Sequence, residues 1–490
     1  MKKYTIKYGN IPVTKQKVCC KITGTVQKTI IKKWNISDKI IVEVYRYMEN
    51  ELFEKAPVHK AYFNMALPLV FSMVISLVYN MVDTYFIART GNTNLVAGVS
   101  LGAPIFTLMI ALGDIFGLGG SSVISRLFGE KKDADGKRLS VFCFYGAILC
   151  GIVITALMLL FRHPILGLLG ADTDTYTYAS QYYTWLVLGA PFIIVALTPS
   201  NLLRTEGFAK ASMIGTILGS VVNIILDPIF ISVLGFGAAG AAIATVIGNI
   251  CSDIFFVWFL LTRSKRLSVS PSGFYIHKAE LLQIFAIGIP ASITNLMQSL
   301  GIALTNRSLL PFGNDHVAAM GIVMKVNMIA VLILVGFAFG GQPLIGYNYG
   351  AKNRRRLKEI LSFAYKFECG LALLLTILLS LAARPMIRIF MKDNTIVSLG
   401  VPMLRMQLLG MVFVAIVLVT TCTFQSAGMA RNAFLLSISR QGVIFAIVLA
   451  IASHTIGYQG ILLSQAISDL LTAVLAIALY RTSVAKELHT

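Results

Sequence analysis

The chain has 490 residues, of which 56% are hydrophobic and only 13% are charged. This composition is far more apolar than that of soluble domains, and it excludes a soluble globular protein. The formal net charge of +20 would suit a nucleic-acid partner, but the basic residues lie in tails and short loops between apolar runs, as in membrane proteins with basic cytoplasmic loops. The sequence therefore predicts an integral membrane protein that binds no nucleic acid.

The sequence lacks the usual signs of catalysis. Its seven cysteines show no metal-ligand spacing. There is no Ser/His/Asp arrangement, no phosphate-binding glycine loop and no pair of catalytic acids in a soluble segment. We expect neither an enzyme nor a bound metal or organic cofactor.

Residues 1–59 are the first part of the chain, a basic and weakly amphipathic N-terminal extension. Two interpretations of it stay open. Either Met48 is the true start of the protein, or the segment is an arm that lies on a membrane surface with anionic lipid. In both cases we expect the extension in the cytoplasm.

Twelve apolar stretches of about 20 residues or more follow, each long enough to cross the roughly 30 Å hydrocarbon core of a bilayer as a helix. The fold class that follows is an all-α integral membrane protein with 12 transmembrane helices. The expected spans are 61–88, 96–127, 139–161, 177–202, 211–234, 240–262, 281–310, 316–349, 359–383, 397–423, 432–453 and 459–481.

The basic residues indicate which side of the membrane each loop occupies. With the N-terminus inside, the cytoplasmic loops hold most Lys and Arg residues, including Lys131, Arg204 and Lys352, whereas the outer loops keep only a few, such as Arg89 and Arg162. Because cytoplasmic loops are enriched in basic residues, both termini are expected in the cytoplasm. We expect a monomeric, multi-pass protein of the cell (plasma) membrane, in contact with membrane lipids.

The two halves of the chain repeat. Pro68 recurs as Pro290 and Gly129 recurs as Gly350, at nearly the same separation along the sequence, which we call the repeat offset. A duplication explains why this offset is almost constant. Because each half has an even number of spans, the pseudo-twofold axis between the two six-helix lobes runs along the membrane normal. The expected parts are a first lobe at 60–262, a cytoplasmic linker at 263–280, a second lobe at 281–482 and a cytoplasmic tail at 483–490.

A cleft between the two lobes is the expected path of the substrate. For lobes that alternate access, we expect spans 1 and 7, or spans 2 and 8, to be close enough for cysteine crosslinks that block turnover.

Two aspartates inside apolar segments are the main functional candidates. Asp83 lies in the first span and Asp227 in the fifth. A helix-centre Asp costs roughly +2.5 to +3.5 kcal/mol on membrane insertion, so such residues usually face the protein interior and mark an ion or substrate pathway. The pair therefore predicts a transporter.

Helix geometry places polar partners near both acids. Because a helix rises by about 1.5 Å per residue, Asp83, Asp227 and Thr245 lie at similar depth in the outer half of the membrane. Asn223 lies four residues before Asp227, on the same helix face. The supporting candidates in and beside these spans are Asn80, Thr84 and Asp114.

These groups fit two kinds of coupling ion. Two carboxylates, an amide oxygen and a hydroxyl are hard ligands that suit a monovalent cation such as sodium. Alternatively, two close carboxylates in a low dielectric share a proton. The residues leave both ions open, together with a purely structural role in hydrogen bonds between helices.

Four motifs resemble those of the multidrug and toxic compound extrusion (MATE) family, in its DinF/MepA-like branch. They are YNMVDTYFI at 79–87, GGSSVISRLFGEK at 119–131, NIILDPIFI at 223–231 and GQPLIGYNYGAKN at 341–353. The resemblance implies two lobes that alternate access and export cationic amphipathic drugs or dyes in exchange for sodium ions or protons. It also implies a cation site at Asp83, Asn223, Asp227 and Thr245.

The chain also departs from the family pattern. A family tyrosine in the fourth span maps onto Tyr182, although Tyr183 fits nearly as well. The second-lobe acid of the NorM-like branch is replaced by Gln298, and the tenth span holds no acid. A coupling site in the second lobe is therefore not expected.

Three other functions match parts of the sequence. A lipid-linked oligosaccharide flippase of the same architecture would need a cationic cavity, whereas the intramembrane charges of the first lobe are acidic. A major-facilitator transporter would also have six plus six helices, but its characteristic loop after the second span is only partly matched by residues 129–138. A receptor or scaffold that does not transport is the third alternative.

Overall fold

A computed structural model describes residues 51–271 and 274–489. Residues 1–50, which include the alternative start at Met48, and residues 272–273 of the linker lie outside the described residues. The expectations for them stay predictions. The helices discussed below belong to one compact unit, Leu52–Thr490. Every regular element in the described residues is a helix, which confirms the all-α prediction.

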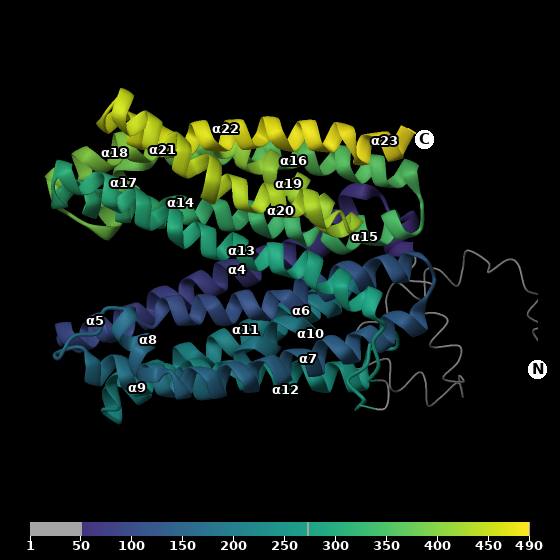
Figure 1. Cartoon of the computed structure of the whole chain (residues 1–490), viewed down its shortest axis with the longest axis horizontal. Helices are drawn as coiled ribbons and strands as arrows, with labels where there is room; N and C mark the ends of the chain where they lie inside the picture. The colour runs from purple at the N-terminus through teal and green to yellow at the C-terminus, as the bar shows by residue number, and fades with distance from the viewer. Residues whose placement is uncertain (1–50, 272–273, 490) are drawn as a thin grey trace, which may run out of the picture. The chain divides into compact units, whose positions relative to one another are not determined.

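The first half of the unit contains the helices that hold both candidate acids (Figure 1). In chain order they are η1 (Glu51–Lys55), α4 (Val58–Arg89), α5 (Thr93–Ser100), α6 (Ala103–Gly129), α7 (Asp133–Leu160), α8 (Arg162–Leu168), α9 (Tyr176–Leu188), α10 (Ala190–Thr205), α11 (Ala209–Asp227), η2 (Pro228–Val233) and α12 (Gly237–Thr262).

The second half repeats this order of long helices. It contains α13 (Lys278–Leu309), η4 (Leu310–Phe312), α14 (Asn314–Gly340), α15 (Gln342–Gly350), α16 (Arg354–Leu381), α17 (Ala383–Phe390), α18 (Asn394–Leu408), α19 (Met411–Ala427), α20 (Ala430–Ile438), η5 (Ser439–Val443), α21 (Ile444–Thr455), α22 (Tyr458–Thr482) and α23 (Val484–His489).

Ten stretches of helix in the described chain are long and apolar enough to cross a membrane, and the number rises to 12 if each of two bent helix pairs is one span. The bent pairs are α9 with α10, at 49°, and α18 with α19, at 44°. They replace the expected continuous spans 177–202 and 397–423. A glycine follows the first helix of each pair closely, Gly189 after α9 and Gly410 after α18, and glycine lowers the cost of leaving the helix.

The backbone itself records the duplication. Lys131 and Lys352, which are separated by the repeat offset, are the two non-glycine residues with positive φ among the described residues, at 64° and 54°. Gly207 and Gly428, at the same offset, have φ of 89° and 77°. Because L-residues rarely adopt such conformations, their recurrence at one offset indicates that the two lobes share their turns as well as their helices.

The lobes meet along a surface that we call the seam, formed by α4 and α6 of the first lobe and by α13 to α16 and α19 of the second. Across it α4 packs against α14, and α6 packs against α13. The first span therefore faces the eighth and the second faces the seventh, rather than the pairs expected for crosslinking. The reason is geometric, since a twofold rotation reverses the order of two neighbouring helices along their interface.

Two symmetric backbone contacts hold the seam close near one end. A Cβ atom on Gly129 would overlap the carbonyl oxygen of Tyr347, and one on Gly350 would overlap that of Arg126. Each contact is the copy of the other at the repeat offset. Glycine is needed at both positions because any side chain would separate the lobes.

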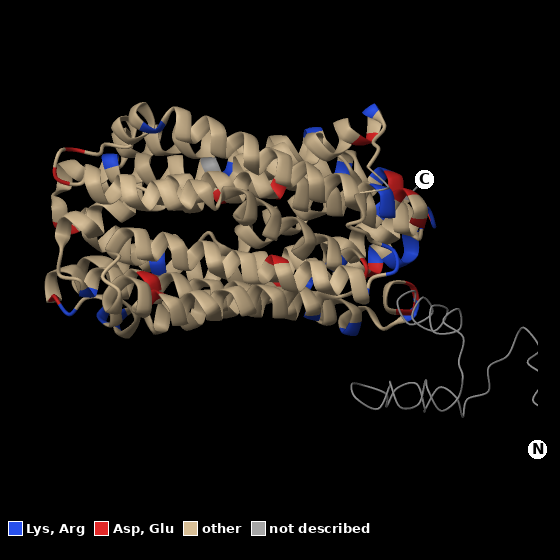
Figure 2. Ribbon diagram, turned by 90° about the horizontal axis from the view of Figure 1, so that it is seen from below, with Lys and Arg blue, Asp and Glu red and all other residues tan. Residues whose placement is uncertain are grey.

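Lys and Arg residues gather at the end of the helices where these contacts lie (Figure 2). We call it the basic end and define it by residues 130–132, 263–266, 351–358 and α23. The opposite end holds α5, α8 and α17 (Figure 1).

Arg204 differs from its expected place in a cytoplasmic loop. It lies in the last turn of α10 and is only 5% exposed. Its guanidinium donates to the Asn201 amide oxygen and interacts electrostatically with Asp114. A long basic side chain at a helix end can turn back into the protein when a buried acid attracts it, and the sequence did not indicate this pairing.

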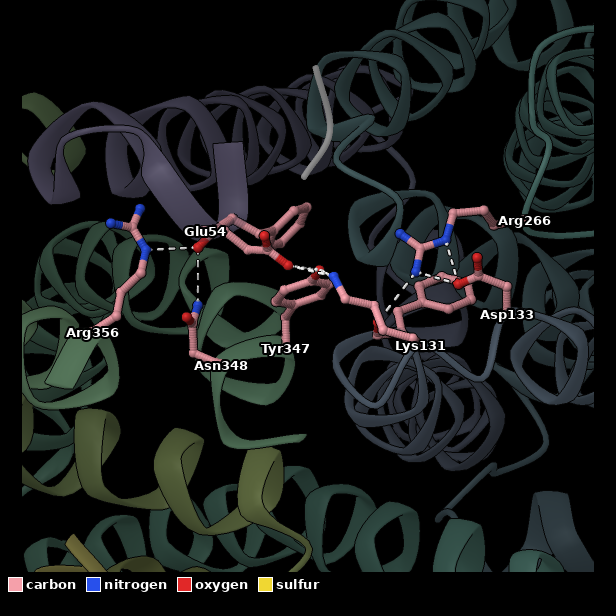
Figure 3. Close-up of polar contacts among 9 residues, drawn as sticks. Glu54, Lys131, Asp133, Arg266, Tyr347, Asn348 and Arg356 are labelled. Carbon is pink, nitrogen blue, oxygen red and sulfur yellow. Dashed lines mark hydrogen bonds and ion pairs between the residues drawn. The ribbon is translucent and has the colours of Figure 1, made fainter. Parts of the chain in front are cut away.

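A group of residues at the basic end ties α4 to the second lobe, and we call it the clasp (Figure 3). It consists of residues 52–56 together with Lys131, Tyr347, Asn348 and Arg356. The Glu54 carboxylate pairs with the Lys131 ammonium and accepts a 2.7 Å hydrogen bond from the Tyr347 hydroxyl. Burial raises the pKa of Glu54, but the hydrogen bonds from Lys131 and Tyr347 outweigh it and hold the pKa below its usual value.

The backbone of the clasp supplies its buried hydrogen bonds. Arg356 Nε donates to the Phe53 carbonyl at 2.7 Å, and its Nη2 donates to the Ala56 carbonyl at 2.6 Å. The Asn348 amide donates to the same Phe53 carbonyl at 3.2 Å. Through these bonds Arg356 fixes the chain immediately before α4 against the second lobe.

Candidate functional site

Asp227 lies at a break in its helix. It is the last residue of α11, and Pro228 starts the π-helical stretch η2. Proline lacks a backbone N–H and cannot continue the α-helical hydrogen-bond ladder, and π-helical turns often accompany functional sites. The break leaves the Asp227 side chain fully buried inside the first lobe.

Asn223 links Asp227 to α12. In the orientation that satisfies both ends of its amide, the nitrogen donates to Asp227 Oδ2 at 3.2 Å and the oxygen accepts from the Thr245 backbone N–H at 3.1 Å. The Thr245 hydroxyl donates to the Ala241 carbonyl of its own helix at 3.1 Å. Its oxygen therefore remains an acceptor, and the structure places Asn223, Asp227 and Thr245 in one cluster.

Asp83 approaches this cluster from α4. Its carboxylate is close enough to interact electrostatically with Asp227, and its Oδ1 is buried with no hydrogen-bond partner among the described residues. Two acids from different helices thus face one region with little support from protein donors. Such an arrangement favours binding of a positive species.

A tyrosine from α9 lies within electrostatic range of the acids. The Tyr182 side chain is 8% exposed and interacts electrostatically with both Asp83 and Asp227. The adjacent Tyr183 points elsewhere, because its hydroxyl donates to the Met158 carbonyl at 2.6 Å. Of the two tyrosines that fit the sequence pattern, the structure brings Tyr182 to the acids.

Sequence reasoning missed Tyr79. It lies one helical turn before Asp83 on α4 and interacts electrostatically with both Asp83 and Asp227. The spacing of four residues was a usable signal, since such pairs share a helix face.

Of the other supporting candidates, Asn80 lines a cavity together with Asn223 and Thr245, whereas Thr84 and Asp114 bond elsewhere. Asn80 donates to the Ser76 carbonyl at 2.7 Å, and Thr84 donates to the Asn80 carbonyl at 2.8 Å, so both bond within α4. Asp114 instead accepts a 3.3 Å hydrogen bond from Asn295 of α13, across the seam. Asp114 thus belongs to the contact between the lobes.

A cavity of about 210 Å³ in the first lobe includes part of the cluster. Tyr79, Asn80, Asn223 and Thr245 line it. The further polar residues of its wall are Ser76, Ser200, Thr216, Ser220, Asn249 and Ser252. This volume is below that of pockets for drug-sized ligands, but it accommodates a cation with water.

The second lobe has no matching acids. At the repeat offset, Thr305 corresponds to Asp83 and Val448 to Asp227. The Thr305 hydroxyl donates to the Gly301 carbonyl of its own helix at 2.9 Å. The duplicated helices are thus present without the duplicated charges.

Comparisons with known proteins agree with this architecture. A family model described as MatE matches residues 68–229 and again residues 290–452, once in each half. The multidrug export protein MepA of Staphylococcus aureus (strain MRSA252) is 31% identical over 425 residues, which covers 87% of this chain and 94% of that protein. MepA of Staphylococcus saprophyticus is 30% identical over 425 residues, with the same coverage.

Solved structures are similar over nearly their whole length. A crystal structure of MATE in complex with MaD3S has a TM-score of 0.85 and 25% sequence identity, covering 90% of this chain and 99% of that one. The outward-facing conformation of a multidrug resistance MATE family transporter has a TM-score of 0.84 and 25% identity, covering 89% and 98%.

Proposed function

The chain belongs to the multidrug and toxic compound extrusion (MATE) family of membrane transporters, and we propose that it exports small cationic amphipathic compounds in exchange for sodium ions or protons. The observation that carries this proposal is the pair Asp83 and Asp227, two acids from different helices that interact within the first lobe. The names of its relatives, multidrug export proteins, support the substrate class.

Exchange follows from competition for negative charge. A coupling cation or proton that neutralises Asp83 and Asp227 removes the charge that attracts a cationic compound, so the two species bind less well together than alone. Such antagonism between two ligands corresponds to a positive coupling free energy, and it is reciprocal. Binding of the ion therefore releases the substrate, and binding of the substrate releases the ion.

Alternating access supplies the path of transport, and the ion gradient sets its direction. Contacts at the basic end hold the lobes together there. By the distribution of basic residues, we infer that this end faces the cytoplasm and that both termini lie there. Release of these contacts would open the seam to the cytoplasm, so that substrate enters from inside and leaves from the other end.

The site fits both sodium and proton coupling. Asp227, Asp83, the Asn223 amide and the Thr245 hydroxyl offer only oxygen ligands to an ion, and two interacting acids also hold a shared proton. We propose a monomer in the cell membrane as the working unit.

Uptake of a cationic dye into proteoliposomes tests the function. Sodium and pH gradients of equal size are imposed separately on vesicles that contain the protein. We expect at least one of the two ion gradients to drive dye transport. The gradient that does so identifies the coupling ion. Dye movement equal to that of protein-free vesicles under both gradients would reject the proposed exchange.

A further inference from the structure

A buried acid of the second lobe lies in the seam, far along the sequence from the acids of the proposed ion site. Glu368 is in the middle of α16 in the second lobe and is fully buried. Neither of its carboxylate oxygens has a hydrogen-bond partner among the described residues. At the repeat offset the first lobe has Ala147, so duplication does not explain this acid.

The donors nearest to Glu368 are already used. The Tyr62 hydroxyl of α4 lies beside the carboxyl, but it donates to the Phe337 carbonyl at 2.9 Å. The Cys422 thiol of α19 also interacts with Glu368, but it donates to the Ala338 carbonyl at 3.2 Å. The hydroxyl oxygen of Tyr62 is left as an acceptor, and Glu368 can bond to it only by donating a proton of its own.

No counter-charge replaces that proton among the described residues. The titratable groups that face Glu368 are Tyr62 of α4, Cys422 of α19 and Cys369 of its own helix, and none of these is a cation. Arg204 of α10, a buried cation, acts on Cys422 and is not among the groups that act on Glu368. Burying an ionised carboxylate without a counter-charge is costly, so a group in such surroundings stays neutral instead.

Burial of Glu368 depends on contact between the lobes. Tyr62 belongs to the first lobe, and its ring packs edge-on against Phe363 of the second lobe at a centroid distance of 5.4 Å. Phe63, also of the first lobe, packs against Phe367 at 5.0 Å. Separation of α4 from α16 would remove both rings, and water would then reach the acid.

We propose that Glu368 is a proton-binding site in the second lobe, which the closed seam holds protonated and the seam opened at the basic end allows to ionise. The proposal deepens the proposed function, since it rests on alternating access and names the proton as a ligand of the second lobe. Closing the basic end then requires a proton on Glu368, and opening that end permits its release.

The sign of the pH effect follows from this linkage. The carboxyl binds its proton more tightly when the lobes are closed than when they are open. Low pH therefore favours closure, and rising pH favours opening. For a single group the ratio of open to closed molecules changes by at most about tenfold per pH unit.

The experiment measures the distance between the lobes at the basic end. Spin labels on unnatural amino acids replace Lys137 of α7 and Lys358 of α16, which are exposed and lie outside the clasp. Electron double resonance follows the full chain in nanodiscs from pH 5 to pH 9, with no substrate and no gradient. We expect the wild type to open as the pH rises and the Glu368→Gln variant to stay closed throughout.

Asp253→Asn is the matched control. Asp253 is also a buried acid whose two oxygens lack a hydrogen-bond partner among the described residues, but it lies on α12, which packs mainly within the first lobe. We expect this variant to open with pH as the wild type does. If the amide of Glu368→Gln disrupts folding, Glu368→Met replaces it and should also stay closed.

A wild-type pH response in a folded Glu368 variant would overturn the proposal, as would a wild-type seam that does not respond to pH. Because the measurement uses no transport, it is independent of the dye experiment. The dye experiment could fail while the seam still opens with pH in the wild type and not in the Glu368 variant. That outcome would reject the proposed substrate exchange and leave the proton site at Glu368 standing.

Discussion

The Asp227 side chain is fully buried, and the Asn223 amide supports it on one side. A lone amide compensates little of the cost of burying a negative charge. Asp83 adds a second negative charge rather than a counter-charge. The two residues are therefore stable together only when a proton or a cation joins them, which is the property that an ion-coupled transporter needs at its ion site.

Tyr182 offers a test at a single hydroxyl. We expect Tyr182→Phe to weaken binding of the coupling ion about fivefold, because one polar group beside a charged site contributes about 1 kcal/mol. Half-saturating ion concentrations of dye transport in proteoliposomes measure the change.

Tyr183→Phe is the control for that test. The variant loses the hydrogen bond to the Met158 carbonyl, so its free energy of unfolding should fall by about 1 kcal/mol. Its affinity for the coupling ion should stay as in the wild type. Equal changes in ion binding for both variants would show that Tyr182 has no special place at the acids.

The same residues show what a sequence can and cannot predict. Asn223 and Asp227 are four apart on one helix, so their contact follows from helix geometry alone. Tyr182 and Tyr183 are adjacent, and which of them comes within electrostatic range of the acids depends on how α9 packs, which no local pattern specifies. Arg204 is a similar case, since its buried position depends on Asp114 of another helix.

At the scale of elements, the clasp is the structure that connects the start of α4 to the second lobe. Arg356 is 9% exposed and donates to the carbonyls of Phe53 and Ala56. We expect Arg356→Ala to lower the free energy of unfolding by about 2 kcal/mol or more, because it leaves two carbonyls without their charged donor. Thermal unfolding in detergent measures the effect.

Arg355→Ala is the matched control for Arg356. The Arg355 side chain is 92% exposed and pairs with Glu359 one turn along α16, and exposed pairs of this kind contribute about 0.5 kcal/mol or less. A comparable loss of stability in both variants would contradict the role given to Arg356.

Glu54 gives the clasp a pH dependence of defined sign. Its pKa is lowered in the folded protein, so its contribution is present near neutral pH and is lost as the pH falls through that lowered value. The pair with Lys131 is partly exposed, so the contribution is below about 1 kcal/mol. Wild type and Glu54→Gln should differ in thermal stability at pH 7, and the difference should shrink as the pH falls through the lowered pKa of Glu54. A difference that does not change with pH would refute this.

Helix boundaries also show where sequence patterns stop being sufficient. Apolar length identified the spans, and the long helices begin and end near the expected residues. The bends at Gly189 and Gly410 were missed, because a glycine within an apolar run is compatible with a continuous membrane helix as well as with a break. The available signal was that these two glycines are themselves separated by the repeat offset.

At the scale of the whole described unit, two copies of one six-helix lobe differ mainly in charge. The turns recur, with matching positive φ values, and the close backbone contacts of Gly129 and Gly350 recur as well. The acids of the proposed ion site occur in the first lobe, and Glu368 occurs in the second. The lobes thus form a symmetric seam, whereas the acids that we propose for ion coupling are placed asymmetrically.

A crosslink across the seam tests lobe movement. Arg126 of α6 and Gln283 of α13 meet across the seam, where the guanidinium donates to the Gln283 amide oxygen at 3.3 Å. We expect the double variant Arg126→Cys with Gln283→Cys to lose dye transport when a reducible bifunctional thiol reagent joins the two cysteines and to recover it on reduction, whereas either single cysteine should transport in both conditions. Full transport by the joined pair would exclude opening of the seam at this position.

The central claim is that ion coupling depends on the two acids of the first lobe, and dye transport by charge-neutral variants tests it most directly. Asp83→Asn, Asp227→Asn, the double variant and Thr305→Ala are compared in proteoliposomes under imposed sodium and pH gradients. Each Asp variant should lose gradient-driven transport, since the single remaining acid offers the coupling ion only one of the two negative charges that attract it. The double variant should be little worse than either single one, and Thr305→Ala should be close to wild type. Wild-type rates in both single Asp variants under either gradient would contradict the account.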